Sequence, residues 1–114
     1  MQTWDTRRLD VEPHHPQVLH SDEEGRTIVI HLPAGEELQD HQVHERAWIL
    51  VVDGEVEIEA ADGTTASGGP GLLALTAPKE RHEVRAKTDT RLVLVLAPWP
   101  GDGHPSNQAE RAEA

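Results

Sequence analysis

The chain has 114 residues, which is enough for one domain with a single hydrophobic core and too few for two domains with a cleft between them. It carries 21 acidic and 10 basic side chains, for a formal charge of −11, so we expect neither nucleic acid nor an anionic membrane as a partner. It contains no cysteine, which excludes disulfides, thiolate catalysis and sulfur-ligated metals. Any metal must be held by His, Asp or Glu.

The first 25 residues are polar and include Pro13 and Pro16. They contain no apolar signal core, and the longest apolar run of the chain, 92–98, is far shorter than a membrane span. This pattern predicts an extended N-terminal arm over 1–25 with one or two edge strands, in a soluble cytoplasmic protein.

From residue 26 onward, short apolar runs alternate with turn signals. Asp53-Gly54 is typical of a hairpin turn, and Asp62-Gly63 predicts a second turn. Strict alternation in 55–60 places Val56 and Ile58 on one buried face. Predicted strands occupy 26–32, 47–52, 55–60, 72–75, 82–86 and 91–97. Strands of this length, separated by turns, predict an all-β sandwich or barrel.

Residues 99–114 lose all strand character, and their composition is typical of a flexible C-terminal tail in which only Trp99 is a candidate for docking. The predicted organisation is therefore an arm over 1–25, a barrel over 26–98 and a tail over 99–114.

Two segments resemble the two short motifs of the cupin superfamily, and the resemblance covers about 26–97. In the first motif, Gly35, His41 and Gly54 stand at the family spacing. Val43 occupies the slot of the second histidine and Ala47 the slot of the glutamate. The resemblance implies a double-stranded β-helix, or jelly-roll, barrel of the small single-domain type.

The second motif keeps Gly71 and His82 in register. Ala77 stands in its proline slot, Lys79 where glycine is usual, and Ala86 where asparagine is usual. Because cupins resemble one another in binding metal through three His and one Glu, two of the four family ligands are retained here. Such nitrogen and oxygen donors suit a divalent transition metal, namely Fe, Mn, Ni, Cu or Zn.

A third ligand would have to come from His44, one position past the family slot. On a regular strand that offset turns His44 to the opposite face from His41, and a bulge would be needed to bring it back. One reading is a metal set of His41, His44 and His82, completed by Glu45 or water. In the other, His41 and His82 are neutral and line a pocket, while His44 and Glu45 face solvent.

The pocket of the second reading would be lined by residues around the start of the strand 47–52. These are Val43, Glu45, Ala47 and Trp48, although Trp48 is also suited to packing outside the barrel. The remaining histidines are expected to have structural or solvent-facing roles: His14, His15, His20, His31 and His104.

Three functions stay open. The first is a metal-dependent enzyme of the dioxygenase or isomerase type acting on a small organic molecule, for which the sequence identifies no catalytic residue. The alternative is a non-catalytic cupin that binds or senses a small ligand with an incomplete metal site. The third is a degenerate barrel kept for dimer assembly, whose sign would be a large apolar outer strand face. The resemblance also implies a homodimer, in which the N-terminal arm could exchange between subunits.

Overall fold

The computed structural model describes residues 1–41 and 43–104, with side chains described for all of these except 39–41. These residues form nine β-strands and no helix, so none of them belongs to a helix able to span a membrane. The strands are β1 (Gln17–Asp22), β2 (Gly25–Leu32), β3 (Glu37–His41), β4 (Arg46–Asp53), β5 (Val56–Ala60), β6 (Thr65–Gly68), β7 (Leu73–Thr76), β8 (His82–Ala86) and β9 (Thr90–Ala97).

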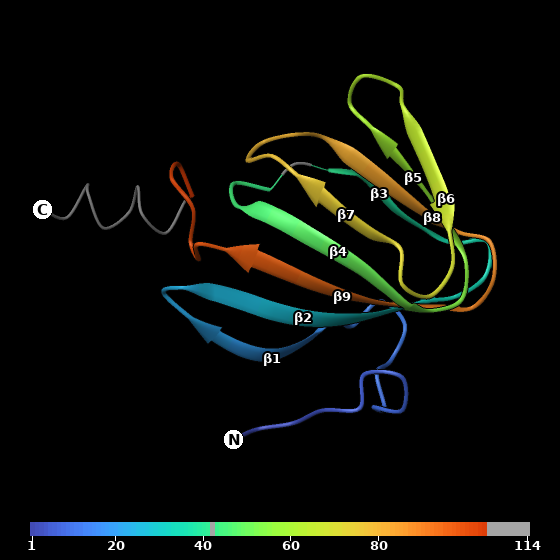
Figure 1. Ribbon diagram of the computed structural model, residues 1–114, viewed down its shortest axis with the longest axis horizontal. Helices are drawn as coiled ribbons and strands as arrows, with labels where there is room; N and C mark the ends of the chain where they lie inside the picture. The colour runs from blue at the N-terminus through green and yellow to red at the C-terminus, as the bar shows by residue number, and fades with distance from the viewer. Residues whose placement is uncertain (42, 105–114) are drawn as a thin grey trace, which may run out of the picture.

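The strands form two antiparallel sheets (Figure 1). The larger sheet has the order β1-β2-β9-β4-β7, and the smaller has the order β3-β8-β5-β6. From β2 onward the chain changes sheet at every connection except the β5–β6 hairpin. This arrangement confirms the predicted all-β jelly roll of short antiparallel strands.

The core lies between the two sheets, and the alternation of side chains along each strand produces it. In β9, buried and partly exposed residues alternate along the whole strand. The same alternation in β5 buries Val56 and Ile58, as the sequence predicts. Both sheets contribute to one cluster of buried side chains: Ile30, Leu32, Ile49, Val51, Val56, Ile58, Val84, Ala86, Leu92 and Leu94.

The prediction of a hairpin at Asp53-Gly54 was wrong. β4 belongs to the larger sheet and pairs with β7 and β9, whereas β5 belongs to the smaller sheet and pairs with β6 and β8. Both edges of β4 are therefore taken, and the turn instead carries the chain from one sheet to the other. Next to β8, the carboxylates of Glu57 and Glu59 find the guanidinium of Arg85.

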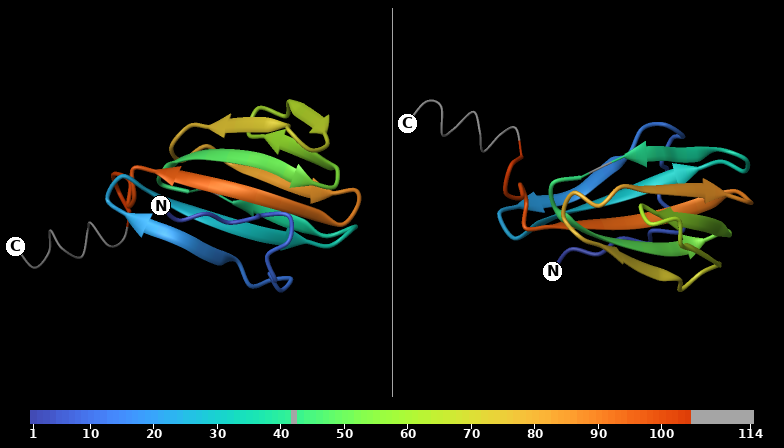
Figure 2. Two further views of the ribbon diagram at one scale, coloured as in Figure 1. Left: turned by 60° about the horizontal axis from the view of Figure 1, so that its bottom comes forward. Right: turned by 90° about the horizontal axis from the view of Figure 1, so that it is seen from above.

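The N-terminal arm lies along the outer face of the larger sheet (Figure 2). The Arg91 guanidinium donates hydrogen bonds to the carbonyl oxygens of Thr6 and Leu9. His31 Nδ1 donates to the Val11 carbonyl at 3.1 Å, which gives this histidine the structural role expected of it. The arm therefore covers the β2 and β9 side of this face, where the outward-pointing Val29 is fully buried.

The inter-sheet turn yields a prediction about two glycines with similar backbone angles. Gly54 has a φ of +82° and Gly63 a φ of +86°, so alanine at either position costs roughly 1–2 kcal/mol in strain. A Cβ at Gly54 would also lie 2.3 Å from the Asp89 carbonyl oxygen, whereas one at Gly63 would meet nothing within 4 Å. We expect Gly54→Ala to lower the free energy of unfolding by roughly 3 kcal/mol or more, and Gly63→Ala by the strain alone. Equal losses in denaturant unfolding would contradict the close approach.

The outer face of the smaller sheet yields a prediction about acid. The hydrogen bond from Arg85 holds the pKa of Glu57 below its ordinary value of 4.5. A carboxyl group with a lowered pKa stabilises the fold above its ordinary pKa and loses that contribution as the pH falls through the lowered value. We expect Arg85→Met to flatten the fall in stability between neutral pH and about pH 3. Denaturant unfolding across this range measures the slope, and Arg8→Met, at an exposed arginine, should leave it unchanged.

Candidate ligand site at the barrel mouth

The residues predicted to form a site gather at one end of the barrel. There β3 ends at His41, β4 begins at Arg46, and β8 begins at His82. The backbone N–H of Lys79 donates to the Val43 carbonyl at 2.7 Å, which joins the loop before β8 to the loop before β4. The two motif-like segments therefore lie side by side, as the resemblance implies.

His82 is the buried histidine of this end, with a relative exposure of 2%. Its Nδ1 lies 3.1 Å from the Glu80 carbonyl oxygen, and because a carbonyl only accepts, Nδ1 carries the hydrogen. In the neutral ring, Nε2 then holds the lone pair that binds a metal or accepts a hydrogen bond. The backbone of His82 pairs in register with His41 on β3, whose side chain lies outside the described residues.

A cavity of about 160 Å³ lies beside His82, between the β5–β6 hairpin and β7. The Thr76 side chain is 5% exposed, and its Oγ1 makes no hydrogen bond with the described residues. The Glu80 carboxylate accepts a hydrogen bond from the Ala77 N–H at 3.0 Å, which shapes the loop before β8. The lining comprises Ile58, Ala60, Thr64, Thr65, Ala66, Ala74, Leu75, Thr76, Glu80 and His82.

Glu45 and His44 make their contacts with the C-terminal segment, by which we mean 98–104. Glu45 is 2% exposed, and its Oε1 accepts a hydrogen bond from the Gly101 N–H at 3.0 Å. His104 Nε2 lies 3.9 Å from the same oxygen. The rings of His44 and His104 meet edge to face at 5.7 Å, and His44 Nδ1 makes no hydrogen bond with the described residues. Glu45 is therefore a buried anchor for this segment.

The C-terminal segment is held at the same end of the barrel as the β1–β2 turn (Figure 1). The Trp99 N–H donates to the Glu23 carbonyl at 3.3 Å, and the Arg26 guanidinium lies 4.0 Å from the Trp99 ring. A Cβ at Gly101 would lie 2.6 Å from the His44 carbonyl oxygen, so the two backbones are in close contact. The rest of the predicted tail, 105–114, lies outside the described residues.

The other predicted pocket residues have different positions. Ala47 points into the core with 1% exposure, whereas Trp48 lies on the outer face of β4 with 40% exposure. Val43 is partly buried in the loop before β4. None of these three is among the residues that line the cavity beside His82.

Metal ligation rests on His82 among the described side chains. No three His, Asp or Glu side chains that the structure describes are placed to hold one metal ion. The hydrogen bond from Nδ1 to a backbone carbonyl is typical of a metal-ligating histidine, so His82 fits as one ligand. The predicted set of His41, His44 and His82 lies partly outside the described residues, since nothing describes the His41 side chain.

Comparison with known proteins decides the family. The family model described as "Cupin domain" matches residues 28–98. This chain belongs to the cupin family. No curated protein is a significant match to this cupin in sequence.

Solved structures of other cupins have the same fold. An RmlC-like cupin from Desulfovibrio desulfuricans has a TM-score of 0.76 and 22% identity, over 86% of this chain and 97% of its own. A protein with a double-stranded β-helix domain from Klebsiella pneumoniae has a TM-score of 0.72 and 21% identity, over 86% and 90%. KdgF from Halomonas sp. has a TM-score of 0.67 and 22% identity, over 79% and 85%. At these identities the likeness establishes the fold alone.

The buried anchor can be tested by substitution of Glu45. Glu45→Ala leaves the Gly101 N–H without its acceptor, which costs about 1–3 kcal/mol for a buried group. We expect faster hydrogen exchange at the backbone amides of 99–104. Glu45→Gln keeps a carbonyl acceptor at the same position and should retain most of the protection. Equal protection in wild type and Glu45→Ala would show that other contacts hold the segment.

Proposed function

We propose that this cupin binds a small organic molecule in the cavity beside His82. The observation that carries the proposal is the Thr76 hydroxyl, which lines the cavity and is buried without a hydrogen-bond partner among the described residues. A buried hydroxyl without a partner destabilises a fold, so its presence is accounted for by a ligand group that bonds to it.

The cavity also indicates what kind of molecule fits. Its volume of about 160 Å³ corresponds to roughly five water molecules in the liquid, so the ligand is small. Ile58, Ala66 and Ala74 supply apolar wall, while Thr76 and His82 supply hydrogen-bonding groups. A ligand with an apolar body and a hydroxyl or carboxyl group at one end satisfies both parts of the lining.

Thr76→Val tests this proposal because it removes the hydroxyl and keeps the shape. Since the hydroxyl has no described partner, we expect the stability of the free protein to stay the same or rise. Binding of small hydroxy acids and sugars, screened by ligand-observed NMR on the wild type, should weaken about tenfold or more in Thr76→Val. Loss of stability with unchanged binding would assign the hydroxyl to the fold and reject its role in the site.

A metal-dependent enzyme is the second candidate, favoured by the tautomer of His82 and by its register with His41. His82 would hold the metal through Nε2, with His41 as the nearest predicted partner. A divalent transition metal at such a site supplies Lewis-acid chemistry or oxygen activation. Glu45 is engaged with Gly101, so the described contacts favour water over Glu45 as a further ligand.

Metal content distinguishes the two candidates. We expect near-stoichiometric transition metal, measured by elemental mass spectrometry on protein purified without an affinity tag, only if the second candidate is correct. His82→Ala should then lose the metal, whereas His20→Ala, at an exposed histidine paired with Asp22, should keep it. No metal in the wild type after reconstitution would leave ligand binding without metal as the function.

A further inference from the structure

The two outer faces of this molecule differ in charge. On the smaller sheet, outward side chains include the acidic residues Glu57, Glu59 and Glu83 around Arg85. On the larger sheet, the outward positions of β4, β7 and β9 are Arg46, Trp48, Leu50, Val52, Leu73, Leu75, Arg91, Val93, Val95 and Ala97. None of these ten is acidic, although the chain carries 21 acidic residues.

The apolar members of this set form one continuous surface, which we call the β4–β7 face and define as Trp48, Leu50, Leu73 and Leu75. Trp48 pairs in register with Leu75, and Leu50 pairs with Leu73. Trp48, Leu73 and Leu75 have relative exposures of 40%, 54% and 50%. Large exposed side chains that adjoin one another in this way mark an interaction site.

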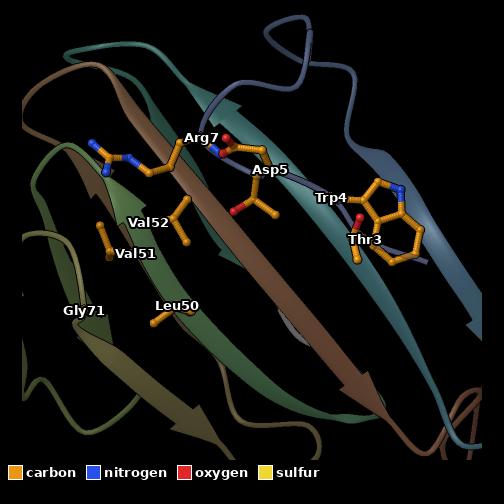
Figure 3. A pocket seen from close by; sticks show the side chains of 9 residues that line it. Thr3, Trp4, Asp5, Arg7, Leu50, Val51, Val52 and Gly71 are labelled. Carbon is orange, nitrogen blue, oxygen red and sulfur yellow. The ribbon is translucent and has the colours of Figure 1, made fainter. Parts of the chain in front are cut away.

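The N-terminal arm covers the neighbouring part of the sheet and stops short of this face. Its residues Thr3–Arg7 stand above β4, and a groove of about 640 Å³ remains between them and Leu50–Val52 (Figure 3). Leu50 belongs to both the groove and the β4–β7 face, so the two are continuous. The arm thus leaves apolar surface open at the β7 edge of the sheet.

We propose that a second copy of this chain covers the β4–β7 face. Two chains that each carry a charge of −11 repel each other, and the repulsion is least where both surfaces lack acidic residues. A two-fold axis through this face would bring leucine and tryptophan side chains together. The same axis would leave the acidic outer faces of both smaller sheets farthest apart and in water.

Light scattering coupled to size exclusion tests the proposal on the full chain. We expect the wild type at micromolar concentration to have twice the chain mass of 12.6 kDa. Leu73→Glu places two like charges at the contact and should give the single-chain mass. The matched control is Val18→Glu, which changes an apolar residue of 45% exposure on β1, at the far edge of the same sheet, and should keep the doubled mass.

Trp48→Glu is the second variant on the face, and circular dichroism confirms that each variant is folded. The single-chain mass for both face variants, with a doubled mass for the control, supports the proposal. A doubled mass in both face variants overturns it, as does a single-chain mass for the wild type at every concentration. In the latter case, protection of Trp48 fluorescence from acrylamide would assign the face to residues 105–114 of the same chain.

Discussion

The two-residue alternation of β4 determines where the side chains at the barrel mouth lie. Ala47 and Ile49 point into the core, while Trp48 points outward. Counting back from Ala47 in steps of two reaches Glu45, which is likewise buried, so a carboxylate enters the interior at the mouth. His44 is out of phase with these residues, and its ring meets His104. One strand therefore provides the core, the anchor for the C-terminal segment and the exposed apolar face.

A carboxylate in a buried position must keep hydrogen bonds that replace those of water. The Gly101 N–H supplies one to Glu45, and His104 lies next to the same oxygen. The close contact of Gly101 with the His44 backbone is what allows that N–H to reach Glu45. Because Glu45 is occupied in this way, His82 and the cavity beside it hold the chemistry at the mouth.

Sequence patterns predicted the strands whose apolar residues alternate or run together, such as 82–86, which β8 matches residue for residue. They did not predict β6 (Thr65–Gly68), which is polar and small and owes its strand to pairing with β5. At the site, the bond between Glu45 and Gly101 joins residues 56 positions apart, so no local pattern could signal it. Thr76 was missed because a threonine at a strand end is ordinary until its burial is known.

The contact between Glu45 and Gly101 also affects where this domain ends. The family match stops at residue 98, within the turn that follows β9, yet the partner of the buried carboxylate lies three residues farther on. A fragment trimmed to the family boundary would keep every strand and still expose Glu45 to solvent beside the core. The unit that folds is therefore longer than the unit that sequence comparison recognises, and its last turn contributes to the closure of the barrel.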